Sequence, residues 1–261
     1  MSKYLEQLSA EVTIERPAEF GIILEKSYTI DVAYDFLSDM PGVDQLERTL
    51  NPIWGENIIY FNYYGKRIVV VSAKGASIAA NAVERVRRTG GRCLVFIGTC
   101  GSTDEAITDG TFVLVSGGVR NEGVTQGYLG LKVPSVSDVK LTDQLRNNLE
   151  NQNVPTMTGL IFTTDNRYQE DPVELKMLRK RADVLAVDME TSAVLLIAKY
   201  HGISAATIKI VTDCAVKDTP GELKGIFDRS KNFIEFVHPK IKIALTAALT
   251  AFTTWGEEND K

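Results

Sequence analysis

Apolar residues along the chain follow two patterns: short continuous runs, and longer stretches in which they recur at helical spacing. A short, wholly apolar run predicts a strand that is buried on both faces. Apolar or β-rich runs predict strands at 21–24, 92–97, 111–116, 156–162 and 204–211. The run at 92–97 (RCLVFI) has too few polar side chains to face water, which predicts a central strand.

Two further β-rich runs, 57–62 and 67–72, lie on either side of a short glycine-containing turn, and this arrangement predicts a β-hairpin. Helical spacing predicts helices at about 27–38 and at 76–89, 139–150, 189–200 and 230–252. The stretch 189–200 is almost wholly apolar, so that helix should be buried. Pro239 either kinks the last helix or begins a second one.

Strands that alternate with helices predict an α/β layered fold. The 261 residues contain no linker, low-complexity tract or repeat, so the simpler interpretation is one domain over 1–261. A net charge of −5 makes nucleic acid an unpromising partner. No apolar run reaches the roughly 20 residues of a membrane span, and the N-terminus lacks an apolar signal-peptide core. We therefore expect a cytoplasmic protein that does not contact a membrane.

Cysteine and histidine are scarce, which limits the chemistry available. Cys93, Cys100 and Cys214 form no CxxC pair, and His201 and His238 are the two histidines. This set makes a metal site improbable and reduced thiols the default. Acid–base chemistry therefore falls to aspartate or glutamate.

Two glycine-containing segments are candidate anion or sugar sites. Gly98-Thr99-Cys100-Gly101-Ser102 follows the central strand, where glycines let the backbone approach a ligand closely. The segment 72–77 (SAKGAS) joins a strand to a helix N-terminus, a place that binds anions. The alternatives are a turn without a ligand for the first, and an ordinary capped helix with a solvated Lys74 for the second.

Two acidic segments complete the candidate set. In Val187-Asp188-Met189-Glu190, Asp188 fits a helix cap, but burying Glu190 at the head of an apolar helix is costly without partners. A carboxylate there could accept hydrogen bonds from two vicinal ribose hydroxyls. Asp213 ends the strand at 204–211, where the alternative role is again a cap.

In order and spacing, six segments resemble the nucleoside phosphorylase superfamily, which contains hexameric purine nucleoside phosphorylase, uridine phosphorylase and methylthioadenosine nucleosidase. The resemblance covers about three quarters of the chain, from Asn57 to the C-terminal helix. The segments are FIGTCGS (96–102), VRNEG (119–123), KVPSVSD (132–138), IFTTDNRY (161–168), VDMETSAV (187–194) and IVTDCA (210–215).

The resemblance implies a three-layer α/β/α domain around a mixed, partly barrel-like sheet. It implies cleavage of the N-glycosidic bond of a nucleoside, the small-molecule partner, by phosphate or water. Phosphate would be a co-substrate, and neither a metal nor an organic cofactor would be needed. Members form homodimers, often assembled into hexamers as trimers of dimers, with sites at the dimer interface.

The resemblance also assigns roles to single residues. Glu190 would bind the ribose 2′- and 3′-hydroxyls while Met189 packs on the sugar. Asp213 would protonate or hydrogen-bond N7 of a purine, and because uridine phosphorylases lack this aspartate, it favours a purine nucleoside. Thr99 would contact phosphate. The base pocket would be lined by Cys100, Gly101, Tyr168 and Arg167, the last replacing a phenylalanine of the family pattern.

The chain departs from the phosphorylase pattern where phosphate-binding arginines are expected. The segment 21–29 (GIILEKSYT) has no glycine–aspartate–proline and no arginine, Phe96 replaces a second arginine, and 51–57 (NPIWGEN) lacks a third. Losing three charge-assisted contacts should cost several kcal/mol of phosphate affinity, roughly.

Three interpretations remain open. Lys26 or Lys74 supplies the missing charge in a divergent phosphorylase, which is the first expectation. Alternatively, water replaces phosphate, as in the nucleosidase branch; the water-handling glutamate of that branch aligns near Thr29, with Glu25 close by. The third interpretation is a nucleoside-binding member without activity. A dinucleotide site is excluded, because GTCGST does not have the G-x-G-x-x-G spacing.

Overall fold

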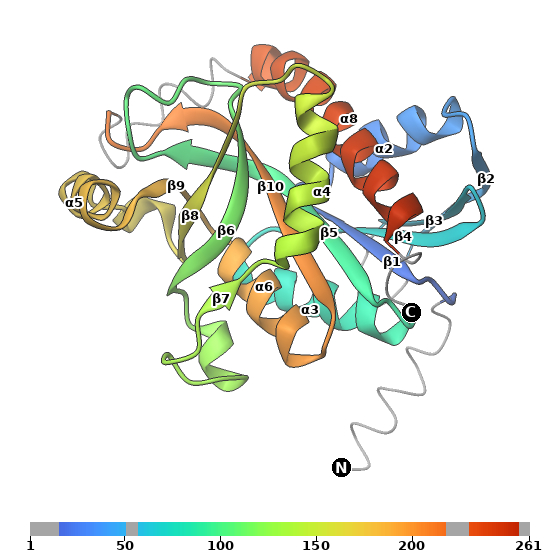
Figure 1. Ribbon diagram of the computed structural model, residues 1–261, viewed down its shortest axis with the longest axis horizontal. Coiled ribbons are helices and arrows are strands. Elements are labelled where there is room, and N and C mark those ends of the chain that lie inside the picture. The colour runs from blue at the N-terminus through green and yellow to red at the C-terminus, as the bar shows by residue number, and fades with distance from the viewer. Residues whose placement is uncertain (1–15, 51–56, 218–229, 256–261) are drawn as a thin grey trace.

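The computed structural model describes residues 16–50, 57–217 and 230–255 (Figure 1). The first 15 residues and most of the 51–57 segment lie outside the described residues, and so does the expectation of a missing arginine in that segment. Within the described ranges, no helix combines the length and apolar character of a candidate membrane span.

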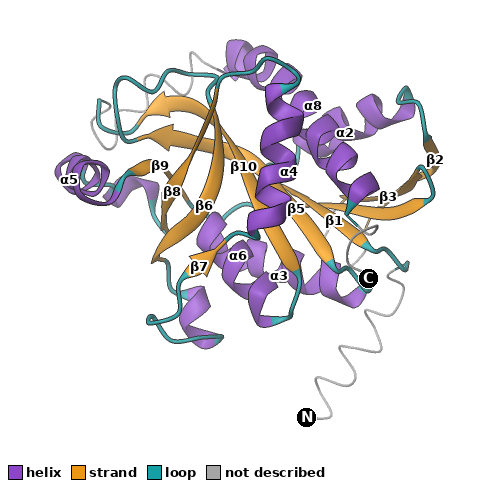
Figure 2. Ribbon diagram, in the orientation of Figure 1, coloured by secondary structure: helices purple, strands orange, loops and turns teal. Residues whose placement is uncertain are grey.

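Ten strands form one mixed sheet, in the order β10-β6-β8-β9-β5-β1-β4-β3-β2, with β7 paired to β6. A further pairing of β10 with β5 closes five of these strands into a barrel (Figure 2). The strands are β1 (Phe20–Leu24), β2 (Val43–Leu50), β3 (Asn57–Tyr63), β4 (Lys66–Ser72), β5 (Cys93–Ser102), β6 (Phe112–Asn121), β7 (Ser135–Val136), β8 (Thr156–Thr164), β9 (Val184–Asp188) and β10 (Ser204–Cys214).

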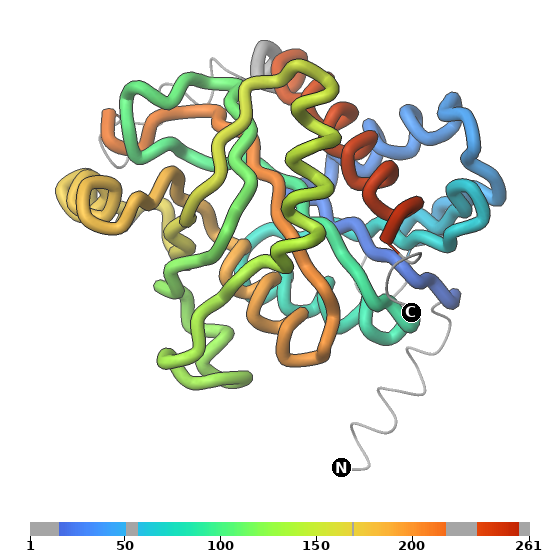
Figure 3. The backbone as a smooth tube through the Cα atoms, viewed as in Figure 1, coloured from blue at the N-terminus to red at the C-terminus, as the bar shows by residue number. Residues whose placement is uncertain are grey.

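The strands that lead to the site run parallel. β1 pairs in parallel with β4 and β5, and β5 pairs in parallel with β10, so their carboxyl ends meet at one edge. Figure 3 shows these segments side by side although they are far apart in the sequence. β9 meets β5 in the antiparallel direction, with Val187 opposite Gly101, and so brings its own end to the same place.

Helices cover both faces of the sheet (Figure 2), which gives the three-layer α/β/α architecture. α2, α4 and α8 pack on one face, and α3 and α6 on the other, while α5 lies against β9. The helices are α2 (Thr29–Ser38), α3 (Ala76–Arg88), α4 (Val139–Glu150), α5 (Pro172–Ala182), α6 (Thr191–Tyr200) and α8 (Ser230–Thr254), with short 3-10 turns η1 (Val124–Gly127) and η2 (Arg167–Gln169).

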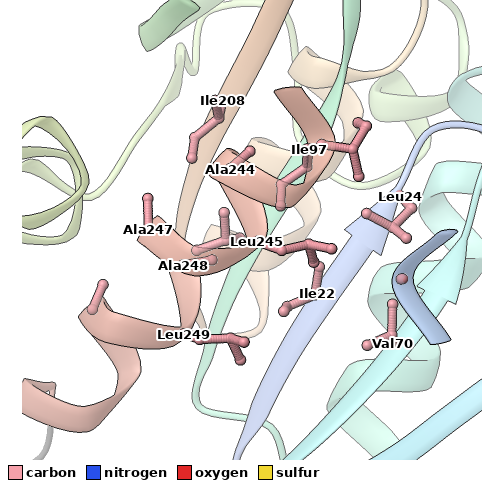
Figure 4. Packing of buried hydrophobic residues seen from close by; sticks show 14 of the residues in the cluster. Ile22, Leu24, Val70, Ile97, Ile208, Ala244, Leu245, Ala247, Ala248 and Leu249 are labelled. Carbon is pink, nitrogen blue, oxygen red and sulfur yellow. The ribbon is translucent and has the colours of Figure 1, made fainter. Parts of the chain in front are cut away.

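The continuous apolar runs arise because these strands are buried on both faces. In β1, Ile22 and Leu24 enter the core beneath α2, α4 and α8, whereas Ile23 enters the core beneath α3 and α6. Figure 4 shows Leu245 and Leu249 of α8 packed near this first set. Two cores on opposite faces therefore hold the central strands in place, and with them the residues at their ends.

Most of the predicted elements are confirmed. The hairpin is β3–β4, the helix at 139–150 is α4, and β5 is central but continues through the glycine segment to Ser102. Pro239 lies inside α8, so the last helix is one element rather than two. The mixed, partly barrel-like sheet is also confirmed. The single domain over 1–261 stays a prediction.

Candidate functional site

A buried charged cluster lies where β1, β4, β5, β9 and β10 end. We define it as Glu25, Lys26, Thr99, Asp188, Glu190 and Lys209. The elements that supply these residues are neighbours in the sheet, so the cluster gathers residues from positions 25 to 209 of the sequence.

Lys209 is the centre of this cluster and is fully buried. Its Nζ lies 2.9 Å from Asp188 Oδ2 and 3.3 Å from Glu190 Oε2. The same Nζ lies 4.1 Å from the centre of the Phe96 ring, a cation–π contact. Burial lowers the pKa of Lys209, but Asp188, Glu190 and Glu25 outweigh it and raise this pKa above its ordinary value. Lys209 is therefore a permanent buried cation.

Glu190 is a buried carboxylate whose side chain does not cap the helix that it precedes. It occupies the N-cap position of α6 but makes no capping hydrogen bond with its side chain. Its Oε1 instead accepts from the Gly75 backbone N–H at 2.8 Å, across the strand-to-helix turn that follows β4. Burial raises the pKa of Glu190 to about 7, with Lys209 opposing the shift.

Asp188 performs the capping that Glu190 does not. Its Oδ2 accepts from the Thr191 backbone N–H at 3.0 Å, and its Oδ1 accepts from the Thr163 hydroxyl at 2.7 Å. The Asp188 carboxylate thus fixes the start of α6, ties β8 to β9, and neutralises Lys209. The capping interpretation of Asp188 is confirmed, and it leaves Glu190 available for another purpose.

Glu25 makes the contacts expected of an anion bound at Thr99. Its Oε2 accepts from both the backbone N–H and the hydroxyl of Thr99, the latter at 2.9 Å. Lys26 Nζ lies 3.4 Å from Glu25 Oε1 and donates to the Thr99 hydroxyl at 2.9 Å. Burial alone would raise the pKa of Glu25, but the two lysines and the Thr99 donors hold this pKa below its ordinary value.

Gly98 permits this close approach. A Cβ at this position would lie 2.8 Å from both Glu25 Oε2 and Lys209 Nζ, closer than carbon can come to either atom. The missing side chain therefore lets the carboxylate and the ammonium group reach the same point on β5.

A second ion pair lies next to the cluster, at the end of β10. Arg167 Nη2 donates to Asp213 Oδ2 at 2.9 Å, and the Thr212 hydroxyl donates to Asp213 Oδ1 at 3.1 Å. Glu170, just after η2, is half-buried, and burial raises its pKa to about 7 despite Arg167. An acid that carries a proton near neutral pH thus stands beside Asp213.

Some of the site residues predicted from the sequence lie in or beside the cluster, and others lie outside it. Thr99, Lys26 and Glu190 belong to the cluster, and Asp213 and Arg167 form the neighbouring pair. Two others lie outside: Lys74 is exposed, with no contact to the cluster among the described residues, and Tyr168 is 62% exposed. Cys100 is buried, with a thiol pKa raised by burial; Gly101 is half-buried in β5, and Met189 is half-buried between Asp188 and Glu190.

The sequence analysis missed Lys209. It mentioned Glu25 only as a neighbour of Thr29, the position aligned with a water-handling glutamate, and not as a partner of Thr99. The signal for Lys209 was present, because it is the one charged residue in the otherwise apolar run AATIKIV of β10. Thr29, the position aligned with a water-handling glutamate, is buried, and its hydroxyl donates to the Lys26 carbonyl instead. Within the described ranges, no group of three or more His, Cys, Asp and Glu residues could hold a metal ion.

Known proteins match this chain over most of its length. The model of the phosphorylase superfamily matches residues 34–252. A purine nucleoside phosphorylase of the DeoD type from Caldanaerobacter subterraneus subsp. tengcongensis is 27% identical over 71% of this chain and 80% of its own. A guanosine phosphorylase from Halorubrum lacusprofundi is 27% identical over 75% of this chain and 80% of its own.

Solved structures agree on the fold. The crystal structure of uridine phosphorylase from Vibrio fischeri ES114 superposes with a TM-score of 0.74, covering 91% of this chain and 92% of that one, at 20% identity. With the family model matching more than half of the sequence, the chain belongs to the phosphorylase superfamily.

Proposed function

We propose that the protein cleaves the N-glycosidic bond of a nucleoside whose base is a purine. The observation that carries the proposal is Glu190, a buried carboxylate held by Gly75 N–H and Lys209 and not used as a helix cap. A carboxylate fixed in this way can accept hydrogen bonds from two vicinal hydroxyls, which is what a ribose presents. Met189, half-buried next to it, would pack on the sugar.

Cleavage needs help at the base. As the bond between C1′ and the base nitrogen breaks, the sugar becomes oxocarbenium-like and the base gains negative charge. Asp213 stands at the end of β10, where it would protonate or hydrogen-bond N7 of a purine. Arg167 holds this carboxylate, and Glu170 beside it carries a proton near neutral pH, so the group could be resupplied with a proton.

Phosphate is the acceptor that the relatives' names support, and Thr99 with Lys26 are the contacts that it would use. Lys74 is exposed, with no contact to the cluster among the described residues, so we propose Lys26 rather than Lys74 for this role. Water is a second candidate, favoured by one observation: the Glu25 carboxylate already takes the Thr99 donors. Neither reaction requires a metal or an organic cofactor.

We further propose that the protein acts as a homodimer or as a hexamer built from three dimers. The exposure of Tyr168, expected to border the base, fits a site that a second subunit covers. Sedimentation velocity of the purified chain tests this, and a monomer at working concentration would contradict it.

Base release from inosine, adenosine, guanosine and uridine, each with and without phosphate, tests the proposed function. The expected result is release of a purine base. Release of uracil alone would contradict the purine assignment. If no base is released under any condition, the proposed cleavage is wrong, and a nucleoside that still raises the melting temperature would then mark a binding protein without activity.

A further inference from the structure

We propose that Glu25 is a built-in occupant of the anion subsite of this protein, so that inorganic phosphate is excluded and water is the acceptor. This inference rests on the proposed N-glycosidic cleavage, because it names the second substrate of that reaction. It concerns a contact between residues of this chain, Glu25 with Thr99, and so can also be tested without any activity.

The first support for the inference is that Glu25 already occupies the hydrogen-bond donors of Thr99. A phosphate bound at the end of β5 would need the Thr99 backbone N–H and the Thr99 hydroxyl. Both donate to Glu25 Oε2, and Lys26 stands beside Glu25 Oε1 at 3.4 Å. The two carboxylate oxygens thus engage the same donors that two phosphate oxygens would use.

The second support is the balance of positive and negative side chains in the cluster. The cluster has three acids, Glu25, Asp188 and Glu190, and two cations, Lys26 and Lys209. The lysines are already matched by carboxylates within 3.4 Å. A phosphate dianion would enter a group of largely buried anions whose two lysines, among the described residues, already pair with carboxylates, whereas a neutral water molecule brings no such conflict.

The position of Glu25 supports it third. Glu25 directly follows β1, a strand wholly buried between the two cores, so its backbone cannot move without disturbing that packing. Gly98 leaves the space into which the carboxylate fits. The pKa of Glu25 lies below its ordinary value, which makes this group a permanent counter-ion rather than a base that takes a proton from water.

The resulting step balances without phosphate. The water oxygen forms a bond to C1′ as the bond from C1′ to the base nitrogen breaks, and the electron pair of that bond stays with the base. The departing base takes up one proton, and the attacking water releases one to the solvent, so no net proton is gained or lost. The products are free ribose and free base, and no further reactant is consumed.

Phosphate binding to the wild-type chain and to Glu25→Ala and Glu25→Gln tests the inference directly. Glu105→Ala is the matched control, because Glu105 is exposed and pairs with Lys217 away from the cluster. Titration with inorganic phosphate, followed by calorimetry and by melting temperature, should show no binding to wild type or control. Both Glu25 variants should bind phosphate at least tenfold more tightly than wild type.

Two results overturn the inference. One is a wild-type chain that binds phosphate as tightly as the variants do, and the other is a pair of correctly folded Glu25 variants, checked by circular dichroism, that both fail to bind it. Failure of the proposed function is separate: no nucleoside is then cleaved by any of the proteins, whatever the phosphate titrations show.

Discussion

Two strand-to-helix joints meet in the site, and they differ in how they use their acidic residue. At the β9–α6 joint (188–191), Asp188 caps the helix and thereby leaves Glu190 directed to Gly75 and Lys209. At the β1–α2 joint (25–29), no side chain caps the helix, and Glu25 turns to Thr99 instead. The first joint keeps the family motif, whereas the second lacks it.

The difference teaches that a carboxylate at a strand-to-helix joint is directed into the site where another residue caps the helix or where no side chain does. The half expected to hold the nucleoside keeps its carboxylates. In the half expected to hold the acceptor, Phe96 stands where the family has an arginine, and Lys209 of the neighbouring strand places its ammonium group over that ring. The buried cation of this chain is therefore on β10, where it neutralises the chain's own carboxylates.

The largest expected effect comes from removing the residue shared by both joints. Lys209→Met leaves Asp188 and Glu190 buried without their cation, and we expect the free energy of unfolding to fall by about 3–5 kcal/mol. Urea denaturation measures this. The same substitution at Lys199, which is exposed on α6, should change stability by less than about 0.5 kcal/mol. Equal losses in the two variants would contradict a central role for Lys209.

The second largest effect is expected from a substitution in the β9–α6 joint alone. Glu190→Ala removes both acceptors for the ribose hydroxyls, and at about 1.5 kcal/mol or more for each charge-assisted bond, affinity should fall roughly 100-fold or more. The fold should survive, because Asp188 still neutralises Lys209. Calorimetric titration with the nucleoside that binds the wild type gives the answer. An unchanged affinity would remove Glu190 from the ribose role.

A third substitution concerns the base. Asp213→Asn should lower kcat for purine nucleosides about 100-fold, with a smaller change in KM, because the acid matters most as charge builds on the base. Steady-state kinetics separates the two parameters. Asp109→Asn, on an exposed loop, is the control. If the loss appears only in KM, Asp213 binds the base but does not assist its departure.

A smaller effect follows from the pKa of Glu190, about 7. The ionised carboxylate is the better acceptor and prevails above that pH, so nucleoside affinity should rise as pH increases through 7 and fall by up to about tenfold per unit below it. Lys209 opposes the raised pKa, and Glu25 and Asp188 reinforce it. The dependence should vanish in Glu190→Gln, and its persistence there would assign it to another group.

The smallest effect is expected at Lys74, and it tests whether this lysine belongs to the acceptor half of the site. Lys74→Ala should change stability by less than about 0.5 kcal/mol and leave base release unaltered, because this lysine is exposed at the turn before α3. A large loss of base release, measured at saturating nucleoside, would return Lys74 to the acceptor half of the site.

Sequence patterns predicted the buried elements well because burial leaves a strong apolar signal. They missed β2, where exposed and half-buried residues leave no apolar run, and α5, where Leu175 is the buried side chain. They also missed the two-residue strand β7, and β9, although all five residues of β9 are buried. In the site, motif residues such as Glu190 could be named because the resemblance assigns them roles. Lys209 could have been noticed as the one charged residue of its run, but its partners could not be predicted, because they depend on a register that places it opposite Gly98 on another strand. Glu25 depends in the same way on the path of β1.

The central claim is that this chain cleaves a nucleoside with water as the acceptor, because the Glu25 carboxylate occupies the subsite that phosphate would need. The most direct test is the sugar product formed from a cleaved purine nucleoside in excess inorganic phosphate, followed by phosphorus NMR and sugar chromatography. The account predicts free ribose, an unchanged phosphate signal, and the same rate of base release in phosphate-free buffer. Ribose 1-phosphate formed in step with the base would contradict it.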